Sequence, residues 1–167
     1  YAHYFIGKVT IYNNFPVVAR ELIYEYMFRY FPDPDKLILS HKEVQVSAKS
    51  KALAKKVFVE KDSTHNFKAL QKAVRAEGET IPSMFNAYIG LTDTMRVFGS
   101  IFDADFGSVY ETGIMITMND LLETKKMRYI VPYIEYVKKV MEERKQALKL
   151  AREKKAAEKL AKAALKK

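Results

Sequence analysis

Residues 129–167 read YIVPYIEYVKKVMEERKQ followed by ALKLAREKKAAEKLAKAALKK. This stretch contains no Gly, and its only Pro is Pro132. Ala, Leu, Lys, Arg, Glu and Gln make up most of it, and these residues favour helix because they lose little side-chain freedom there. We therefore predict a long C-terminal helix that is kinked at Pro132.

Charge divides the chain into two parts. Residues 138–167 contain 12 basic and four acidic residues, whereas residues 1–137 contain 17 basic and 16 acidic residues. Nearly all of the net charge of +9 therefore belongs to the tail. We predict a near-neutral globular body over residues 1–137 and a basic helical extension over residues 138–167.

The body mixes strand and helix patterns without a regular alternation. Runs rich in β-branched and aromatic residues predict strands over residues 3–12, 36–46 and 109–118. Apolar residues at three- and four-residue spacing predict helices over residues 16–31, 65–76 and 79–98, with a loop over 99–107. Asp62, Ser63 or Thr64 is expected to cap the second helix. The predicted class is α+β, with a small mixed sheet, packed helices and a long basic C-terminal helix.

Several classes of site are excluded or disfavoured. The chain has no Cys, which excludes disulfides and Cys-based metal sites. It has no Gly-rich phosphate-binding loop, and its three His residues are far apart in the sequence. Asp105-Phe106-Gly107 matches a kinase metal motif, but the other kinase motifs are missing. We therefore expect no cofactor, no metal site and no recognisable catalytic residue.

Basic residues are the candidate contact sites. An acidic protein groove, RNA or an anionic membrane surface would each attract them. The alternative is that they form solvated faces of a helix and a loop. The candidates in the tail are Lys145, Lys149, Arg152, Lys155, Lys159 and Lys162, and those in the body are Lys49, Lys51, Lys55 and Lys56.

Three hypotheses for function follow. The first is a non-catalytic structural subunit of a large multi-subunit assembly, such as a mitochondrial complex, whose basic C-terminal helix docks on other protein subunits. The second is a ribosomal-type RNA-binding protein. The third is a small enzyme whose site is assembled from scattered polar residues, namely Asp93, Arg96, Asp103 and Glu111.

The sequence also bears on location. The longest uncharged stretch, residues 80–92, is shorter than the roughly 20 residues that a membrane-spanning helix needs. The chain begins with Tyr1, as a chain would after removal of a leader or as a piece of a longer protein. We expect an intracellular protein, with a mitochondrial matrix as one location that suits a processed, basic chain.

Overall fold

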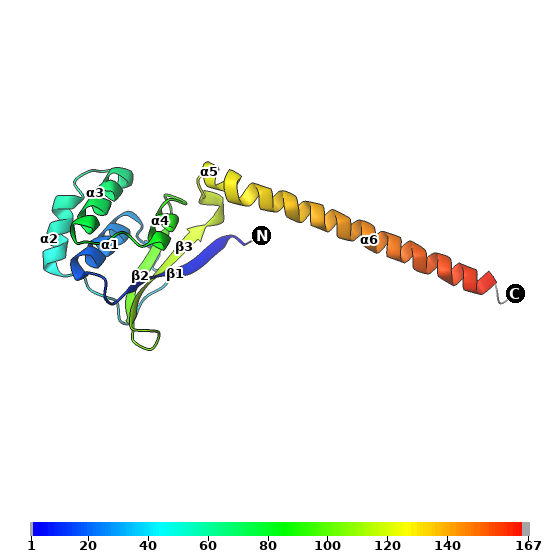
Figure 1. Cartoon of the computed structure of the whole chain (residues 1–167), viewed down its shortest axis with the longest axis horizontal. Helices are drawn as coiled ribbons and strands as arrows, with labels where there is room; N and C mark the ends of the chain where they lie inside the picture. Colours follow the sequence, from blue (N-terminus) through cyan, green and yellow to red (C-terminus); the bar gives the residue numbers. More distant parts are fainter. Residues whose placement is uncertain (1, 165–167) are drawn as a thin grey trace. The chain divides into compact units, whose positions relative to one another are not determined.

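The computed structural model describes residues 2–164, with side chains up to residue 157. Contacts divide the chain into two units, residues 1–122 and residues 123–167. The first unit contains β1 (Tyr4–Tyr12), α1 (Val17–Tyr30), α2 (Ala48–Val57), α3 (Ser63–Ala76), α4 (Ser83–Ile89), β2 (Arg96–Asp103) and β3 (Val109–Thr117) (Figure 1). The predicted α+β class is confirmed. The predicted boundary between residues 137 and 138 marks the change in charge and stays a prediction.

The sheet has three antiparallel strands in the order β1-β3-β2. β3 is the central strand, with Gly113 opposite Lys8 of β1 and Glu111 opposite Ile101 of β2. The register of β2 shifts between Val97 and Ser100, which marks a bulge.

One face of the sheet belongs to the core. Alternation along the strands places Val9, Ile11, Ile114 and Ile116 on this face, and all four are at most 1% exposed. Helix α1 supplies the facing layer, with its largest buried side chains at Leu22, Ile23, Tyr24, Tyr26 and Met27. Burial raises the pKa of the Tyr24 hydroxyl, so that this group stays protonated. The opposite face, which carries Ile6, Lys8, Ile101 and Glu111, is called the open face below.

The predicted strand over residues 36–46 is wrong. Only Glu43 forms a bridge, to Ile101, and the Val44 N–H donates to the Ser100 carbonyl at 2.7 Å. At Val97, β2 pairs instead with Pro32. The edge of β2 is therefore shared between two short segments, and the bulge separates them. The apolar residues between these segments, Leu37–Leu39, remain exposed.

Residues 48–57 and 79–103 also differ from prediction. The predicted helix 79–98 ends as α4 at Ile89, and β2 occupies both its end and the first part of the predicted loop 99–107. Helix α2 was not predicted, although Ser47 caps it by accepting from the Ser50 N–H. Residues 96–103 form a strand because they pair with β3. A strand is stabilised by its neighbours more than by its own composition.

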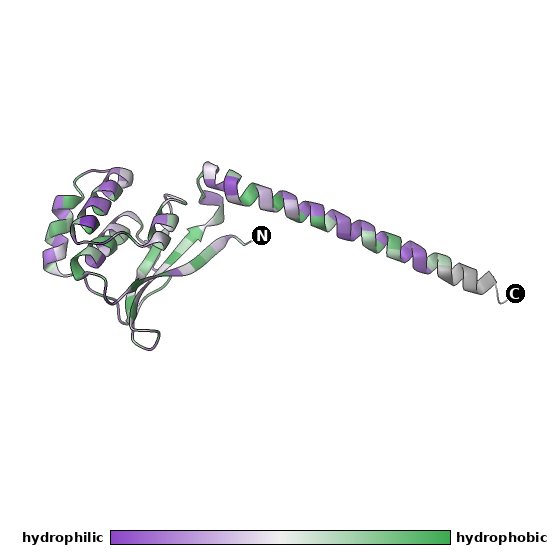
Figure 2. Ribbon diagram, viewed as in Figure 1, coloured by the Kyte–Doolittle hydropathy of each residue, from purple (hydrophilic) through white to green (hydrophobic). Residues whose placement is uncertain are grey.

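The second unit is helical throughout its described residues. A short α5 (Glu123–Lys125) leads into a π-helical turn (Lys126–Ile130) and then into α6 (Val131–Ala164). Pro132, the site of the predicted kink, follows the π-helical turn directly, and a proline that lacks an N–H commonly accompanies such an irregularity. Polar and apolar residues are interspersed along α6 (Figure 2). Within residues 2–164, no helix is both long enough and apolar enough to span a membrane.

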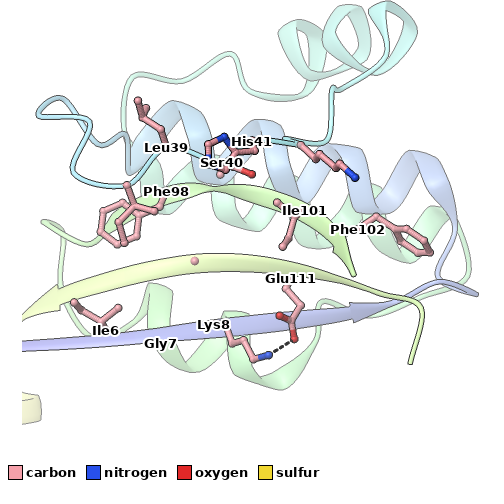
Figure 3. Close-up of a pocket in the computed structure, with 14 residues that line it drawn as sticks. Ile6, Gly7, Lys8, Leu39, Ser40, His41, Phe98, Ile101, Phe102 and Glu111 are labelled. Atoms are coloured by element: carbon pink, nitrogen blue, oxygen red, sulfur yellow. Dashed lines mark ion pairs between the residues drawn. The ribbon is translucent and has the colours of Figure 1, made fainter. Parts of the chain in front are cut away.

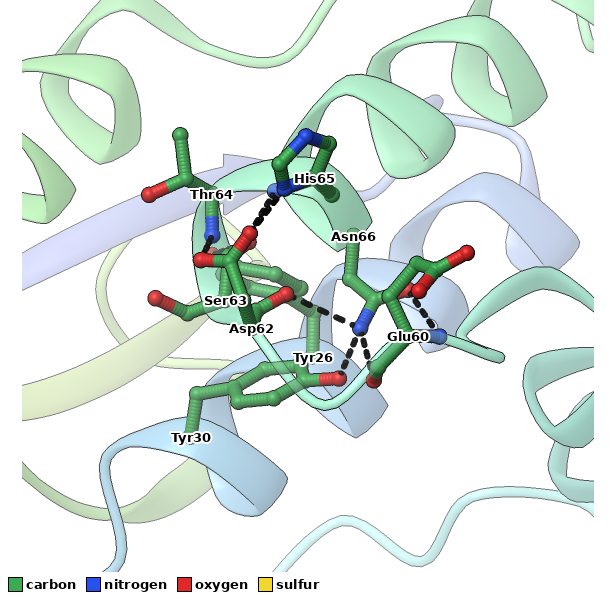
Figure 4. Close-up of polar contacts among 8 residues, drawn as sticks. All are labelled: Tyr26, Tyr30, Glu60, Asp62, Ser63, Thr64, His65 and Asn66. Carbon is green, nitrogen blue, oxygen red and sulfur yellow. Dashed lines mark hydrogen bonds and ion pairs between the residues drawn. The ribbon is translucent and has the colours of Figure 1, made fainter.

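Asn66 holds the start of α3 against α1. Its side-chain NH₂ donates to the Tyr30 hydroxyl at 2.6 Å and to the carbonyls of Glu60 and Asp62, while its oxygen accepts from the Glu60 N–H (Figure 4). Asp62, one of the three predicted candidates, caps the helix by accepting from the N–H groups of Thr64 and His65. A hydrogen bond from the His65 ring, with those backbone bonds, lowers the pKa of Asp62 to about 2.

Replacing Asn66 by Ala should lower the free energy of unfolding by about 2 kcal/mol, because Asn66 is 1% exposed and its loss leaves buried polar groups unpaired. Urea denaturation measures this change. Lys68→Ala, on an exposed position of the same helix, is the control and should cost less than about 0.5 kcal/mol. Equal effects of the two substitutions would contradict the role given to Asn66.

Candidate functional site

A cavity of about 520 Å³ lies on the open face and reaches across all three strands. Its walls are mainly apolar, and its volume is within the range typical of small-molecule sites. Figure 3 shows the cavity between the sheet and the segment that carries Leu39 and His41. The apolar lining side chains are Ile6, Ile38, Leu39, Phe98, Ile101 and Phe102.

The bulge in β2 shapes one wall. Gly99 lies at the bulge with a φ of +104°, and a Cβ there would come within 2.7 Å of the Glu43 Oε1 atom. The positive φ favours Gly at this position, whereas the flexible end of the Glu43 side chain could move aside. The packing of Glu43 on Gly99, together with the bridge from Glu43 to Ile101, holds the 38–42 segment beside β2.

An ion pair lies in this mainly apolar cavity, whose other polar lining residues are Ser40, His41 and Lys42. The Lys8 Nζ atom is 2.6 Å from the Glu111 Oε1 atom (Figure 3). Because Lys8 is opposite Gly113, Glu111 is its diagonal neighbour on the same face of the sheet. The Glu111 side chain is 9% exposed and that of Lys8 is 55% exposed. The carboxylate is therefore sheltered from solvent, whereas the lysine remains free to move.

A turn between β2 and β3 completes the surroundings of Lys8. The Asp103 carboxylate accepts from the N–H groups of Asp105 and Phe106, which closes the turn. Phe106 thereby lies with its ring centroid 4.5 Å from the Lys8 Nζ atom, a cation–π distance. The Asp105-Phe106-Gly107 motif is thus part of a hairpin turn, and it places an aromatic ring against the lysine.

Of the four polar residues of the enzyme hypothesis, Asp93 is exposed, and the other three have separate partners. Arg96 pairs with Asp35 and Asp33, and these hydrogen bonds raise the pKa of its guanidinium. Asp103 closes the turn just described. Of the four, only Glu111 lines the cavity. The structure therefore does not assemble the predicted set around one site.

The predicted basic contact residues lie on two helices. The candidates in the body are on α2 and are exposed, and Lys145, Lys149, Arg152 and Lys155 are exposed on α6. Lys159 and Lys162 also belong to α6, but their side chains are outside the described part. Contact of these residues with a partner stays a prediction.

Lys8 was not predicted as a site residue from the sequence, and Glu111 was predicted as one without its partner. Lys8 follows a strand pattern and reads as an exposed position of that strand. Its partner comes from the other end of the body, so that only the strand register could have joined the two residues. Within the described residues, no group of three or more His, Cys, Asp or Glu side chains is arranged to hold a metal ion.

Two curated relatives connect this chain with acyl transfer. A protein of Phocaeicola vulgatus is 36% identical over 132 residues, and a protein of Bacteroides thetaiotaomicron is 33% identical over 132 residues. Both are named glycine N(alpha)-acyltransferase. Each alignment covers 79% of this chain but only 40% and 39% of the respective relative, so the chain matches about two fifths of their length.

No protein-family model matches the chain, and no solved structure gives a significant match. The names of the two relatives overturn the leading hypothesis from the sequence. The prediction of a non-catalytic structural subunit of a large assembly, such as a mitochondrial complex, is wrong, because both relatives are named for an enzymatic reaction.

Proposed function

We propose that the protein to which this chain belongs is an enzyme that transfers an acyl group to the amino group of glycine. Its similarity over 132 residues to two proteins named for that reaction supports the proposal. The observation that carries it within the structure is the cavity on the open face, in which apolar walls surround one sheltered carboxylate.

The cavity offers what N-acylation needs. Ile6, Leu39 and Ile101 provide apolar surface for the hydrocarbon part of an acyl group. An amine attacks an acyl carbon only in its neutral form, so a nearby carboxylate that accepts a proton assists the reaction. Amide formation from an activated acyl donor requires no metal or nucleotide-binding loop. The lack of these motifs in the sequence is thus compatible with catalysis.

The two relatives do not support the predicted mitochondrial location. Both relatives come from bacteria, so neither favours the mitochondrial matrix that was considered from the basic sequence and the first residue.

We expect the complete native protein to convert glycine and a long-chain acyl thioester into an N-acylglycine, which mass spectrometry would detect. Leu39→Lys should raise the KM for a long-chain donor about tenfold, because a loss of about 1.4 kcal/mol of apolar contact corresponds to that factor. Leu39 is 71% exposed before the donor binds, so the substitution should leave the fold intact.

Val59→Lys is the matched control, because Val59 is 69% exposed and does not line the cavity. It should leave the KM unchanged. Failure of every acyl donor to react with glycine would refute the proposed activity. Equal KM values for the two variants would show that the cavity does not bind the acyl donor.

As a second candidate, we propose that α6 contacts an anionic lipid surface. Support comes from the exposed basic residues of α6, which include Lys145, Lys149, Arg152 and Lys155. Basic side chains close to an anionic lipid surface each contribute about 1 kcal/mol of attraction. An N-acylglycine would itself be amphiphilic and would enter such a surface, which favours lipid over RNA as the partner.

Sedimentation with vesicles tests this candidate. Binding to vesicles with about one third anionic lipid should fall steeply between 50 and 500 mM salt, because salt screens surface charge. Replacing Lys145, Lys149, Arg152 and Lys155 by Gln should weaken binding about tenfold or more. The control replaces Lys49, Lys51, Lys55 and Lys56 by Gln, with the same change in charge. Binding to RNA but not to vesicles would contradict the lipid assignment.

A further inference from the structure

We infer that Lys8 and Glu111 together form the binding site for the amino acid that accepts the acyl group. In this arrangement Glu111 binds the ammonium group and Lys8 binds the carboxylate. The inference rests on the proposed function and deepens it, because it assigns the acceptor site to two residues and limits the acceptor to small molecules that carry both charges.

Glu111 is suited to an ammonium group. Among the residues that line the cavity it is the only carboxylate, and its residue exposure is 8%. The apolar Ile6, Phe98 and Ile101 side chains of this cavity cannot solvate a charge, and its other polar side chains, Ser40, His41 and Lys42, come from the segment beside the sheet. Charges attract more strongly in such surroundings than in water, and Lys8 is the cation now in contact with Glu111. An incoming ammonium group can take the place of the lysine.

Lys8 is suited to move and to take the carboxylate. Its side chain is 55% exposed, lies on the edge strand β1 and is held by one ion pair and by the face of the Phe106 ring. Its flexible stem allows the ammonium group to turn a few ångströms without movement of the backbone. The Phe106 ring can keep contact with the lysine during this movement.

Charge balance then determines which ligand fits. A ligand with only an amine would displace Lys8, whose 55% exposed side chain would gain no new partner, and a ligand with only a carboxylate would draw Lys8 away and leave the sheltered Glu111 unpaired. An unpaired charge in a sheltered site is costly. A zwitterion replaces one ion pair by two, so every charge keeps a partner. The pair thus favours a free α-amino acid over an amine or a carboxylic acid.

Gly113 leaves space for this ligand beside the pair. It lies opposite Lys8 and two residues from Glu111, on the same face. A Cβ at this position would lie 3.5 Å from the Phe98 Cβ atom, which is an ordinary contact. Gly113→Ala is therefore compatible with the fold, but its methyl group would occupy the space next to the ion pair.

The reaction can be written with named groups and one co-reactant, an acyl thioester. Glu111 takes a proton from the bound ammonium group and passes it to solvent. The neutral nitrogen attacks the thioester carbonyl, a C–N bond forms and the C–S bond breaks. The second proton lost by the nitrogen goes to the departing thiolate. The products are an N-acyl amino acid and a thiol.

Steady-state kinetics with glycine and glycinamide test the assignment, because glycinamide keeps the amine and lacks the carboxylate. In Lys8→Met, the KM for glycine should rise about tenfold or more, and the preference for glycine over glycinamide should disappear. Glu111→Gln should lower kcat about 100-fold or more for both acceptors, since it removes the proton acceptor. Lys8→Arg should keep the preference for glycine.

Binding and folding controls keep the outcomes separate. Calorimetric titration with glycine should show weaker binding to Lys8→Met and Gly113→Ala, without any acyl donor present. Lys68→Met, an exposed substitution on α3, should behave as the wild type. If the wild type acylates no amino acid, the proposed function fails. If it acylates glycine, but Lys8→Met keeps both its KM and its preference for glycine, only the acceptor site is refuted.

Discussion

The antiparallel register of β3 against β1 and β2 is the constraint on which the rest of the structure depends. Successive residues of a strand point to opposite faces, so a shift by one residue would exchange the two faces. The register is anchored in the core, where the Ser100 and Thr112 hydroxyls form a buried hydrogen bond of 2.6 Å. The same register turns Glu111 toward Lys8. The core and the candidate site thus both depend on the same strand register.

The irregular part of β2 has a complementary role. A regular strand would offer one continuous edge, and the 36–46 segment would be able to join the sheet along its length. The bulge at Gly99 breaks that edge and leaves Glu43 as the point of attachment. The residues before Glu43 then stand beside the sheet and form a cavity wall. A local defect in pairing therefore creates the concave surface that a small ligand needs.

The sequence predicted the elements whose signals are local. The alternation in β1, the helical spacing in α1 and the cap within residues 62–64 depend on neighbouring residues, and these predictions are confirmed. Residues 36–46 and 91–103 were misassigned because their conformation depends on which strand they meet. Lys8 and Glu111 meet only through β3, so periodicity alone could not join them. The predicted α+β class needed only the local signals.

The error about catalysis has a physical origin as well. Metal ions, phosphates and covalent nucleophiles require fixed sets of residues, which produce recognisable motifs. Acyl transfer to an amine requires a sheltered proton acceptor and a place for two substrates, and one Glu in an ordinary strand can satisfy the first requirement. An ion pair whose lysine is 55% exposed contributes only about 0–1 kcal/mol to stability. Stability therefore explains poorly why Lys8 and Glu111 lie within apolar walls. Binding of a ligand with two opposite charges would explain it.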